Sequence, residues 1–337
     1  FGWAVGPIIA AASATVGSAL VLAEGGPDYP DPGRMWRLAQ DHEATVLGTA
    51  PTAIRALMRH GTEEIEKYDL SKLRLIVSTG EPWTDEAWWW TFEHVGKRRL
   101  AILNWCGGSE IGGGILCGNV LTPMKPCAFS GAIPGMAADI VDEAGHSVAP
   151  GEVGELVLRH PSIGLSRGLW KDPERYLETY WSMFENLWRQ GDWASRDEDG
   201  MWYVHGRSDD TIKVSGKRTG PAEIEGLLMA SGKVSEAAVI GLPDQIKGQS
   251  IGCVCVPAPG VAGDEALVAD LTAAVVDGMG RSFRPARIVF VDDLPKTRSM
   301  KIMRRVIRAV VVGEAPGDLS SMVNPESLEG LKAAAAG

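Results

Sequence analysis

Strand-like and helix-like segments alternate along the chain, and this alternation constrains its fold more than any other feature. Short runs rich in β-branched and aliphatic residues occur at Thr45–Thr49 and Leu73–Ser78. Between them, Pro51–Arg59 has helical spacing, with apolar residues recurring on one face. A third apolar run, Ala101–Asn104, leads directly into a glycine-rich segment. Because alternating strands and helices form layered sheets, we predict an α/β fold.

The pattern changes twice further along the chain. From Gly131 to Leu158 short strands are separated by turns, and after Gly206 helix and strand signals return. The elements predicted for this last part are a helix at Pro221–Met229, strands at Val234–Gly241 and Ser250–Val256, a helix at Leu267–Val276, a strand at Ile288–Val291 and a basic helix at Lys301–Val312. Together they predict a compact α+β module. The polar residues 313–337 predict a flexible tail.

Composition narrows the class of protein. The formal net charge of -10 argues against a general nucleic-acid binder, which needs a basic surface. Residues 1–23 carry no charged side chain, but small and polar residues dilute the run and no basic stretch precedes it. We therefore predict a buried helix packed by alanine and glycine, not a membrane span or a signal peptide. The five cysteines form no C-x-x-C pair and the six histidines no H-E-x-x-H pattern, so we expect reduced thiols in a cytoplasmic protein.

The glycine-rich segment Asn104–Gly114 is the most informative motif. Its glycines let backbone N–H groups approach a ligand closely, and Ser109 and Glu110 supply oxygen ligands that suit Mg²⁺ beside phosphates. A nucleophile elbow, G-x-S-x-G, fails because Ile111 occupies its last position. A G-x-G-x-x-G dinucleotide fingerprint is also absent, because Cys117 stands where the last glycine should be. A flexible turn without a ligand remains the alternative.

Other polar segments are weaker signals when taken singly. The turn Ser78–Pro82 follows a predicted strand, where open α/β sheets bind ligands, and Asp192 could accept hydrogen bonds from ribose hydroxyls. Asp209 and Asp210 suit a solvated linker. Six positive charges lie close together near the C-terminus, at Lys296, Arg298, Lys301, Arg304, Arg305 and Arg308. They indicate a solvated basic helix, a nucleic-acid patch or, in this acidic chain, recruitment of an anionic small substrate.

Taken in this order, the segments resemble the acyl-adenylate-forming ligases, most closely the branch of AMP-forming acetyl-CoA synthetases. The resemblance runs from about Gly2 to Arg308. Further matching segments are Gly2-Trp3, Glu24–Pro27, Thr49–Met58 and Trp170–Glu174. In that family a carboxylic acid reacts with ATP to give acyl-AMP and pyrophosphate, and the CoA thiol then displaces AMP. The resemblance implies a ligase that uses ATP, Mg²⁺, coenzyme A and a small-molecule carboxylate, with no nucleic-acid or membrane partner.

The resemblance also implies a domain organisation. Residues 1–207 would form the C-terminal portion of a large adenylation domain, with mixed α/β sheets and a small β subdomain. Residues 208–312 would form a small α+β lid domain with its hinge at 209–210, followed by the flexible tail at 313–337.

The resemblance assigns roles to individual residues. Those expected to bind ATP or AMP are Gly80, Glu81, Pro82, Asn104, Trp105, Cys106, Gly107, Gly108, Ser109, Asp192, Arg207 and Arg218. Glu110 would hold Mg²⁺, and Asp209 would be the hinge on which the lid rotates. Lys301 would be the catalytic lysine, placing its ammonium between carboxylate and α-phosphate oxygens during adenylation. The residues expected at the CoA channel are Ser215 and Gly216, and those at the acyl pocket are Trp3, Val5 and Gly107.

Three departures from the family pattern refine the expectation. Met300 replaces the usual glycine beside Lys301. Gly107 replaces a tryptophan that closes the acyl pocket of acetate-specific members, so we predict a short- to medium-chain carboxylate unless Trp105 compensates. The family's Ser/Thr/Gly-rich phosphate loop is absent, so we predict an N-terminally incomplete ligase without strong ATP-dependent activity by itself.

Two alternatives stay open: an adenylation unit that loads a carrier protein, and a non-catalytic nucleotide-binding fragment. The oligomeric state is not predicted.

Overall fold

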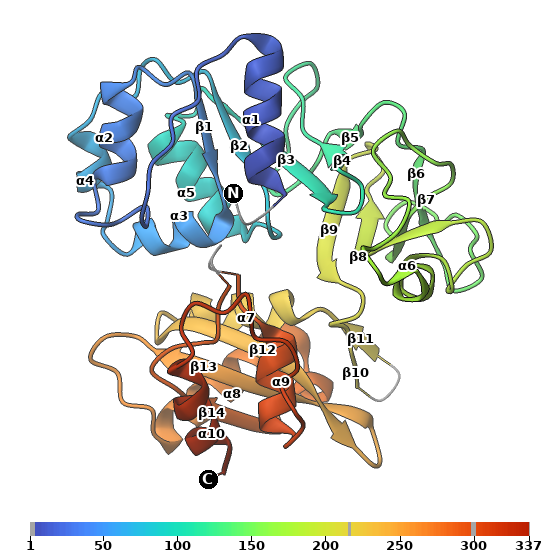
Figure 1. Ribbon diagram of the computed structural model, residues 1–337. Coiled ribbons are helices and arrows are strands. Elements are labelled where there is room, and N and C mark those ends of the chain that lie inside the picture. The colour runs from blue at the N-terminus through green and yellow to red at the C-terminus, as the bar shows by residue number, and fades with distance from the viewer. Residues whose placement is uncertain (1–3, 215–216, 298–300, 337) are drawn as a thin grey trace. The chain divides into compact units, whose positions relative to one another are not determined.

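The computed structural model describes residues 4–214, 217–297 and 301–336, except the side chains of 217, 218 and 336. The chain divides into two compact units, Phe1–Val204 and His205–Gly337, which run from blue to yellow and from yellow to red in Figure 1. The division falls shortly before the boundary at 207 that the resemblance implies. None of the helices in the described ranges has the length and hydropathy that spanning a bilayer requires.

The first sheet of unit 1 is mixed, in the order β1-β2-β3-β4-β5. Its first three strands are parallel, and β4 runs antiparallel to both of its neighbours. The strands are β1 (Val46–Thr49), β2 (Leu75–Ser78), β3 (Ala101–Gly108), β4 (Gly113–Cys117) and β5 (Gly131–Ala132). The helical elements beside them are α1 (Val5–Val16), α2 (Arg34–Asp41), α3 (Pro51–Met58), α4 (Glu63–Glu66), α5 (Asp85–Trp90) and a π-helical turn (Thr91–Val95).

Apolar spacing explains how the helices cover the parallel strands. In α3, Pro51 occupies the first turn, where its missing N–H costs nothing, and Ile54 and Leu57 share one buried face. They belong to one hydrophobic core with Ile76 of β2 and Trp88 of α5. This order of strand, helix and strand confirms the predicted α/β alternation.

The second sheet of unit 1 has four strands in the order β6-β7-β8-β9. They are β6 (Ala138–Val141), β7 (Gly154–Leu158), β8 (Trp188–Arg196) and β9 (Trp202–Arg207), and α6 (Pro173–Tyr180) contacts β8. Ile140, Leu156 and Trp188 form a core that also includes Ile115 of β4. The two sheets of unit 1 therefore share a hydrophobic core beside the glycine-rich segment.

Unit 2 is built on one sheet in the order β11-β10-β13-β12, with β14 also paired to β13. Its strands are β10 (Ile212–Val214), β11 (Lys217–Thr219), β12 (Val234–Asp244), β13 (Gly248–Pro257) and β14 (Arg287–Phe290). Its helices are α7 (Pro221–Ala230), α8 (Glu265–Met279), a 3₁₀ turn (Arg281–Phe283), α9 (Arg304–Val311) and α10 (Ser327–Ala336).

Alternation along the two long strands gives unit 2 a core on each face of its sheet. Val239 and Cys253 belong to the core that includes α7 and α8. Their neighbours Ala238 and Val254 belong to the core that includes α9 and α10. Successive strand residues point to opposite faces, so a sheet covered on both sides needs apolar residues at nearly every position.

Two sequence predictions about the chain's ends are wrong. None of the α1 residues is buried, and the backbone at 18–23 is not helical. The described residues of the expected buried helix are instead half-buried or exposed. At the other end, 313–337 is not a flexible tail throughout, because α10 buries Leu328 and Leu331. Their i, i+3 spacing places both leucines on one helical face.

Candidate active site

The glycine-rich segment forms a tight hairpin, not an open loop. Along β3 and β4, Gly107 lies opposite Gly114 and Gly108 opposite Gly113, with an irregularity in register just before Gly107. A β carbon added at Gly107 would lie 2.0 Å from the carbonyl oxygen of Gly113. Only glycine fits this backbone, because real β carbons do not approach a carbonyl oxygen so closely.

Three neighbouring parallel strands carry polar side chains at the same register. Thr49 of β1 pairs with Ser78 of β2, and Ser78 pairs with Asn104 of β3. Each has a buried side-chain oxygen, Oγ1, Oγ and Oδ1 respectively, without a hydrogen-bond partner among the described residues. Asn104 does use its amide nitrogen, which donates to the carbonyl oxygen of Ala128 at 2.9 Å. Buried oxygens of this kind are rare in folded proteins and point to a missing partner such as a ligand.

Strand β8 of the second sheet supplies two buried side chains to the hairpin. Asp192 Oδ2 lies 3.9 Å from Cys106 Sγ. Gln190 Nε2 donates to the carbonyl oxygen of Gly107 at 3.2 Å. Sequence reasoning found Asp192 but missed Gln190, although residues two apart on a strand share a face. The structure thus brings Asp192 together with the Asn104–Gly108 strand.

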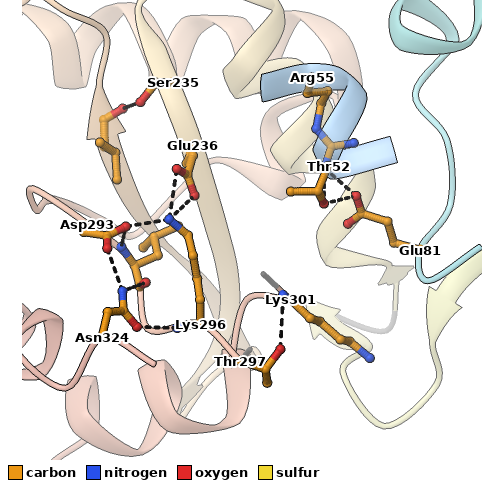
Figure 2. A network of polar contacts seen from close by, with 12 residues as sticks. Thr52, Arg55, Glu81, Ser235, Glu236, Asp293, Lys296, Thr297, Lys301 and Asn324 are labelled. Carbon is orange, nitrogen blue, oxygen red and sulfur yellow. Dashed lines mark hydrogen bonds and ion pairs between the residues drawn. The ribbon is translucent and has the colours of Figure 1, made fainter. Parts of the chain in front are cut away.

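The loop that follows β2 is tied to helix α3. Gly80 has a φ of 106°, a conformation that favours glycine. The carboxylate of Glu81 accepts hydrogen bonds from Thr52 and, at 2.7 Å, from Nη2 of Arg55, as Figure 2 shows. Glu81 and its half-buried neighbour Pro82 closely follow Ser78 in sequence, but the Glu81 carboxylate is already engaged by α3.

The turn between β3 and β4 carries the two residues expected near a metal. Ser109 is exposed, and the Glu110 carboxylate makes no ion pair within the described ranges. Its Oε2 atom lies 3.8 Å from where a β carbon of Gly108 would be. In those ranges no three His, Cys, Asp or Glu side chains gather into a metal cluster. A single carboxylate beside a glycine hairpin fits Mg²⁺, which takes few protein ligands when phosphates supply the others.

The remaining positions of the predicted site differ in how far they are described. Arg207, at the end of β9, donates to both carboxylate oxygens of Asp209, at 2.9 and 3.1 Å. Val5 is the first residue of α1 and is partly buried. Trp105 is partly buried, with its indole against Gly114. Outside the described residues or side chains lie Trp3, Ser215, Gly216, Arg218 and Met300.

Lys301 lies in an extended segment before α9, not on the predicted basic helix. Thr297 N donates to Lys301 O at 2.9 Å, and Met303 N donates to Pro295 O at 2.9 Å. These bonds hold residues 301–303 alongside 295–297, so the helix begins only at Arg304. The side chain of Lys301 is exposed, and its ammonium makes no hydrogen bond or ion pair within the described ranges. Its positive charge does act on Asp210.

The other described cations of this stretch are held by groups of unit 2. Lys296 is paired with Glu236 and Asp293, and Arg304 with Glu225. Arg305 donates to the carbonyl oxygens of Pro316 and Asp318, at 3.0 and 2.9 Å. One further contact completes the set, between Arg308 and Glu314 at 3.3 Å. Four of the five described cations thus have partners within unit 2, which leaves Lys301 as the described cation of this stretch whose side chain has none.

Comparison with known proteins identifies the family. A family model described as AMP-binding enzyme matches residues 1–170, half of the chain. The chain belongs to the AMP-binding enzyme family. A second model, the AMP-binding enzyme C-terminal domain, matches residues 223–301. Both matches confirm the family that the sequence motifs predicted.

Relatives of this AMP-binding enzyme include two acetyl-coenzyme A synthetases. The protein of Methanothrix soehngenii is 41% identical over 98% of this chain and 50% of its own length. That of Rubrobacter xylanophilus is 42% identical over 98% of this chain and 52% of its own length. The chain therefore spans about half the length of the curated relatives it matches.

Two solved structures share the fold of this AMP-binding enzyme. An anthranilate CoA ligase in complex with anthranoyl-AMP is 29% identical, with a TM-score of 0.73 over 87% of this chain and 54% of that chain. An acetoacetyl-CoA synthetase from Streptomyces lividans is 24% identical, with a TM-score of 0.83 over 95% of this chain and 49% of that chain. These likenesses confirm the predicted fold class.

Proposed function

We propose that the protein carrying this chain is an ATP-dependent acid–thiol ligase that works through an acyl-adenylate. The observation that carries the proposal is the row of Thr49, Ser78 and Asn104, three polar side chains at one register with unpartnered buried oxygens. The row lies beside a hairpin that only glycine can form and that Asp192 approaches. Ligands of open α/β sheets bind at the carboxyl ends of strands, and a nucleotide offers amino and hydroxyl donors for such oxygens.

The reaction has two balanced steps. A carboxylate oxygen of the substrate attacks the α-phosphorus of ATP, the bond to pyrophosphate breaks, and acyl-AMP forms. The sulfur of coenzyme A then attacks the acyl carbonyl carbon, AMP leaves, and the thiol proton is released. Negative charge builds up on phosphate oxygens in the first step, so a positioned cation accelerates it.

Each residue of the proposed site has one task. Asp192 accepts hydrogen bonds from the ribose hydroxyls, and Asn104 Oδ1 accepts one from the adenine amine. Glu110 holds Mg²⁺, which neutralises phosphate charge when bound. Lys301 neutralises charge on the α-phosphate and the attacking carboxylate, since its ammonium is uncommitted among the described residues. Asp209 is the proposed hinge, and Ser215 and Gly216 are the proposed contacts to coenzyme A.

The proposed substrate is acetate or another short- to medium-chain carboxylate. Two relatives at 41% and 42% identity are named acetyl-coenzyme A synthetases. The backbone at Gly107 leaves no room for a side chain that would close the acyl pocket, which favours an acid longer than acetate. Comparing activation of acetate, butyrate and hexanoate tests this point. A strong preference for acetate would contradict the inference that the substrate is longer than acetate.

The proposed function is tested by introducing Lys301→Ala into the protein that carries this chain. Adenylation, measured as ATP–pyrophosphate exchange, should fall by about 10²- to 10³-fold, because a preorganised charge is lost from the transition state. Thioester formation from supplied acyl-AMP should be largely kept. Lys247→Ala is the matched control, since Lys247 is an exposed lysine of the same unit.

The same assays separate the rival functions. Transfer of the acyl group to a phosphopantetheinyl protein but not to free coenzyme A would identify a carrier-loading adenylation unit. AMP binding in calorimetry without any exchange activity would identify a non-catalytic nucleotide-binding protein. Equal loss of both steps in Lys301→Ala would contradict the assigned role of the lysine.

A further inference from the structure

The extended segment 301–303, which carries Lys301, is one edge of a small ladder of extended segments. On one side, residues 295–297 bond to 301–303 through the two hydrogen bonds already described. On the other side they bond to a segment from the C-terminal region. Val323 N donates to Lys296 O at 3.0 Å, and Thr297 forms a β-bridge with Met322. Residues 295–297 are therefore the central segment of this ladder.

The side chain of Asn324 completes the central segment. Its Oδ1 accepts the backbone N–H of Lys296 at 2.9 Å. Its Nδ2 donates to Asp293 Oδ2 at 2.6 Å and to the carbonyl oxygen of Leu294 at 2.8 Å. Figure 2 shows Asn324 below Asp293 and to the left of Lys296, with Lys301 to the right of Lys296. Asn324 is 7% exposed, so these bonds are made away from water, where each counts for more.

The same network includes the buried ammonium of Lys296, which also holds the central segment in place. Lys296 is 6% exposed, and its Nζ lies 2.5 Å from Asp293 Oδ1 and 2.9 Å from Glu236 Oε2. Asp293 thus bridges Lys296 and Asn324. Loss of the Asn324 amide would remove the donor to Asp293 Oδ2.

The C-terminal segment that carries Asn324 is anchored at both ends. Upstream, Arg305 donates to the carbonyl oxygens of Pro316 and Asp318. Downstream, Leu331 of α10 is fully buried in the core that contains Leu294 and Ile307. The segment therefore has a fixed position from which to hold the ladder.

We propose that Asn324 is a positioning residue for Lys301, through which the C-terminal segment sets the place of the backbone at residues 301–303. The inference rests on the proposed role of Lys301 in adenylation. Asn324 touches no reacting atom in this proposal. It orients 293–297, and that segment in turn holds the backbone of Lys301.

The test is to introduce Asn324→Ala into the protein that carries this chain. Adenylation should fall by about tenfold to a hundredfold, because a misplacement of about 1 Å in a catalytic group costs that much. Thioester formation from supplied acyl-AMP should stay unchanged. A merely structural role would lower both steps equally. Ser327→Ala is the matched control, since Ser327 is equally buried and its Oγ donates to Asn324 O at 2.7 Å without touching the amide.

Hydrogen exchange gives a readout that does not depend on activity. The backbone amides of Lys296, Thr297 and Met303 should exchange faster in Asn324→Ala and at the native rate in Ser327→Ala. If Asn324→Ala does not fold, Asn324→Ser retains an acceptor but no amide donors, and both readouts apply to it. Unchanged exchange and unchanged adenylation would overturn the proposal.

Lys301→Ala, measured alongside, separates the two hypotheses. If Lys301→Ala leaves adenylation intact, the proposed function is wrong, and the role of Asn324 is then tested by amide exchange alone. If it abolishes adenylation while the Asn324 variants behave like the native protein, the function stands and the positioning role is wrong.

Discussion

At the scale of single residues, the backbone at Gly107 decides what the hairpin can be. The carbonyl oxygen of Gly113 occupies the space where a side chain of residue 107 would begin. Gly131, in β5 of the same sheet, has no atom within 4 Å of its β-carbon position. Two glycines of one sheet thus differ in whether the fold needs them.

We expect Gly107→Ala to destabilise unit 1 by about 1–3 kcal/mol, because the methyl group forces β3 and β4 apart. Gly131→Ala should change stability by less than about 0.5 kcal/mol. Urea unfolding followed by tryptophan fluorescence measures both, since all 12 tryptophans lie in unit 1. Equal stability of the two variants would show that the hairpin is not closed in solution.

The buried carboxylate of Asp139 gives unit 1 an acid-sensitive contact. It accepts hydrogen bonds from Ser147 at 2.5 Å and from Arg159 at 2.6 Å. Burial raises the pKa of Asp139, but these bonds outweigh it, so the pKa lies below its ordinary value of 3.8. A carboxyl with a lowered pKa stabilises the fold above its unfolded pKa, and this contribution is lost as the pH falls through the folded value.

We therefore expect the unfolding free energy of unit 1 to fall between about pH 5 and pH 2, and to fall less steeply in Asp139→Asn. The exposed Asp41→Asn is the control and should keep the native slope. Urea titrations at a series of pH values measure the slopes. A native slope in Asp139→Asn would contradict the assignment.

At the scale of elements, local patterns predicted those whose partners are near in sequence. The apolar face of α3 and the glycines of the β3–β4 hairpin are visible in the residue types alone. The helix at Lys301–Val312 was predicted three residues too early, because hydrogen bonds to 295–297 keep 301–303 extended. Helix α10 was not predicted because the residues before it are polar and contain glycine, so its two core leucines did not stand out.

Helix α10 should contribute measurably to the stability of unit 2. Leu331 is fully buried, so Leu331→Ala should cost about 2–5 kcal/mol through lost burial and a cavity. Lys332→Ala, next to it and exposed, should be nearly neutral. Thermal unfolding followed by circular dichroism measures both. A flexible tail would make the two variants equivalent.

At the scale of the whole molecule, the two units have separate hydrophobic cores. The cores of unit 2 contain only residues between Ile212 and Ala334, and those of unit 1 only residues between Met35 and Val204. A unit with its own core folds without the other. The proposed domain organisation therefore has a direct test.

We expect residues 205–337, expressed alone, to unfold cooperatively. Leu331→Ala should lower the midpoint in this fragment as it does in the full chain. Circular dichroism with heating measures the transition, and dispersed amide resonances would show fixed packing. A broad transition with exposed apolar surface would mean that unit 2 depends on unit 1.

The sequence by itself determined the family and the fold class, because motif order and glycine placement can be recognised from the residue types. For the candidate site it supplied positions that remain predictions. Only the tertiary structure aligned Thr49, Ser78 and Asn104, brought Gln190 to Gly107, and joined Asn324 to Lys296. It also showed that the four other described cations near Lys301 have partners within unit 2. These partners lie far apart in sequence, and strand register and packing, which one sequence does not record, decide which side chains meet.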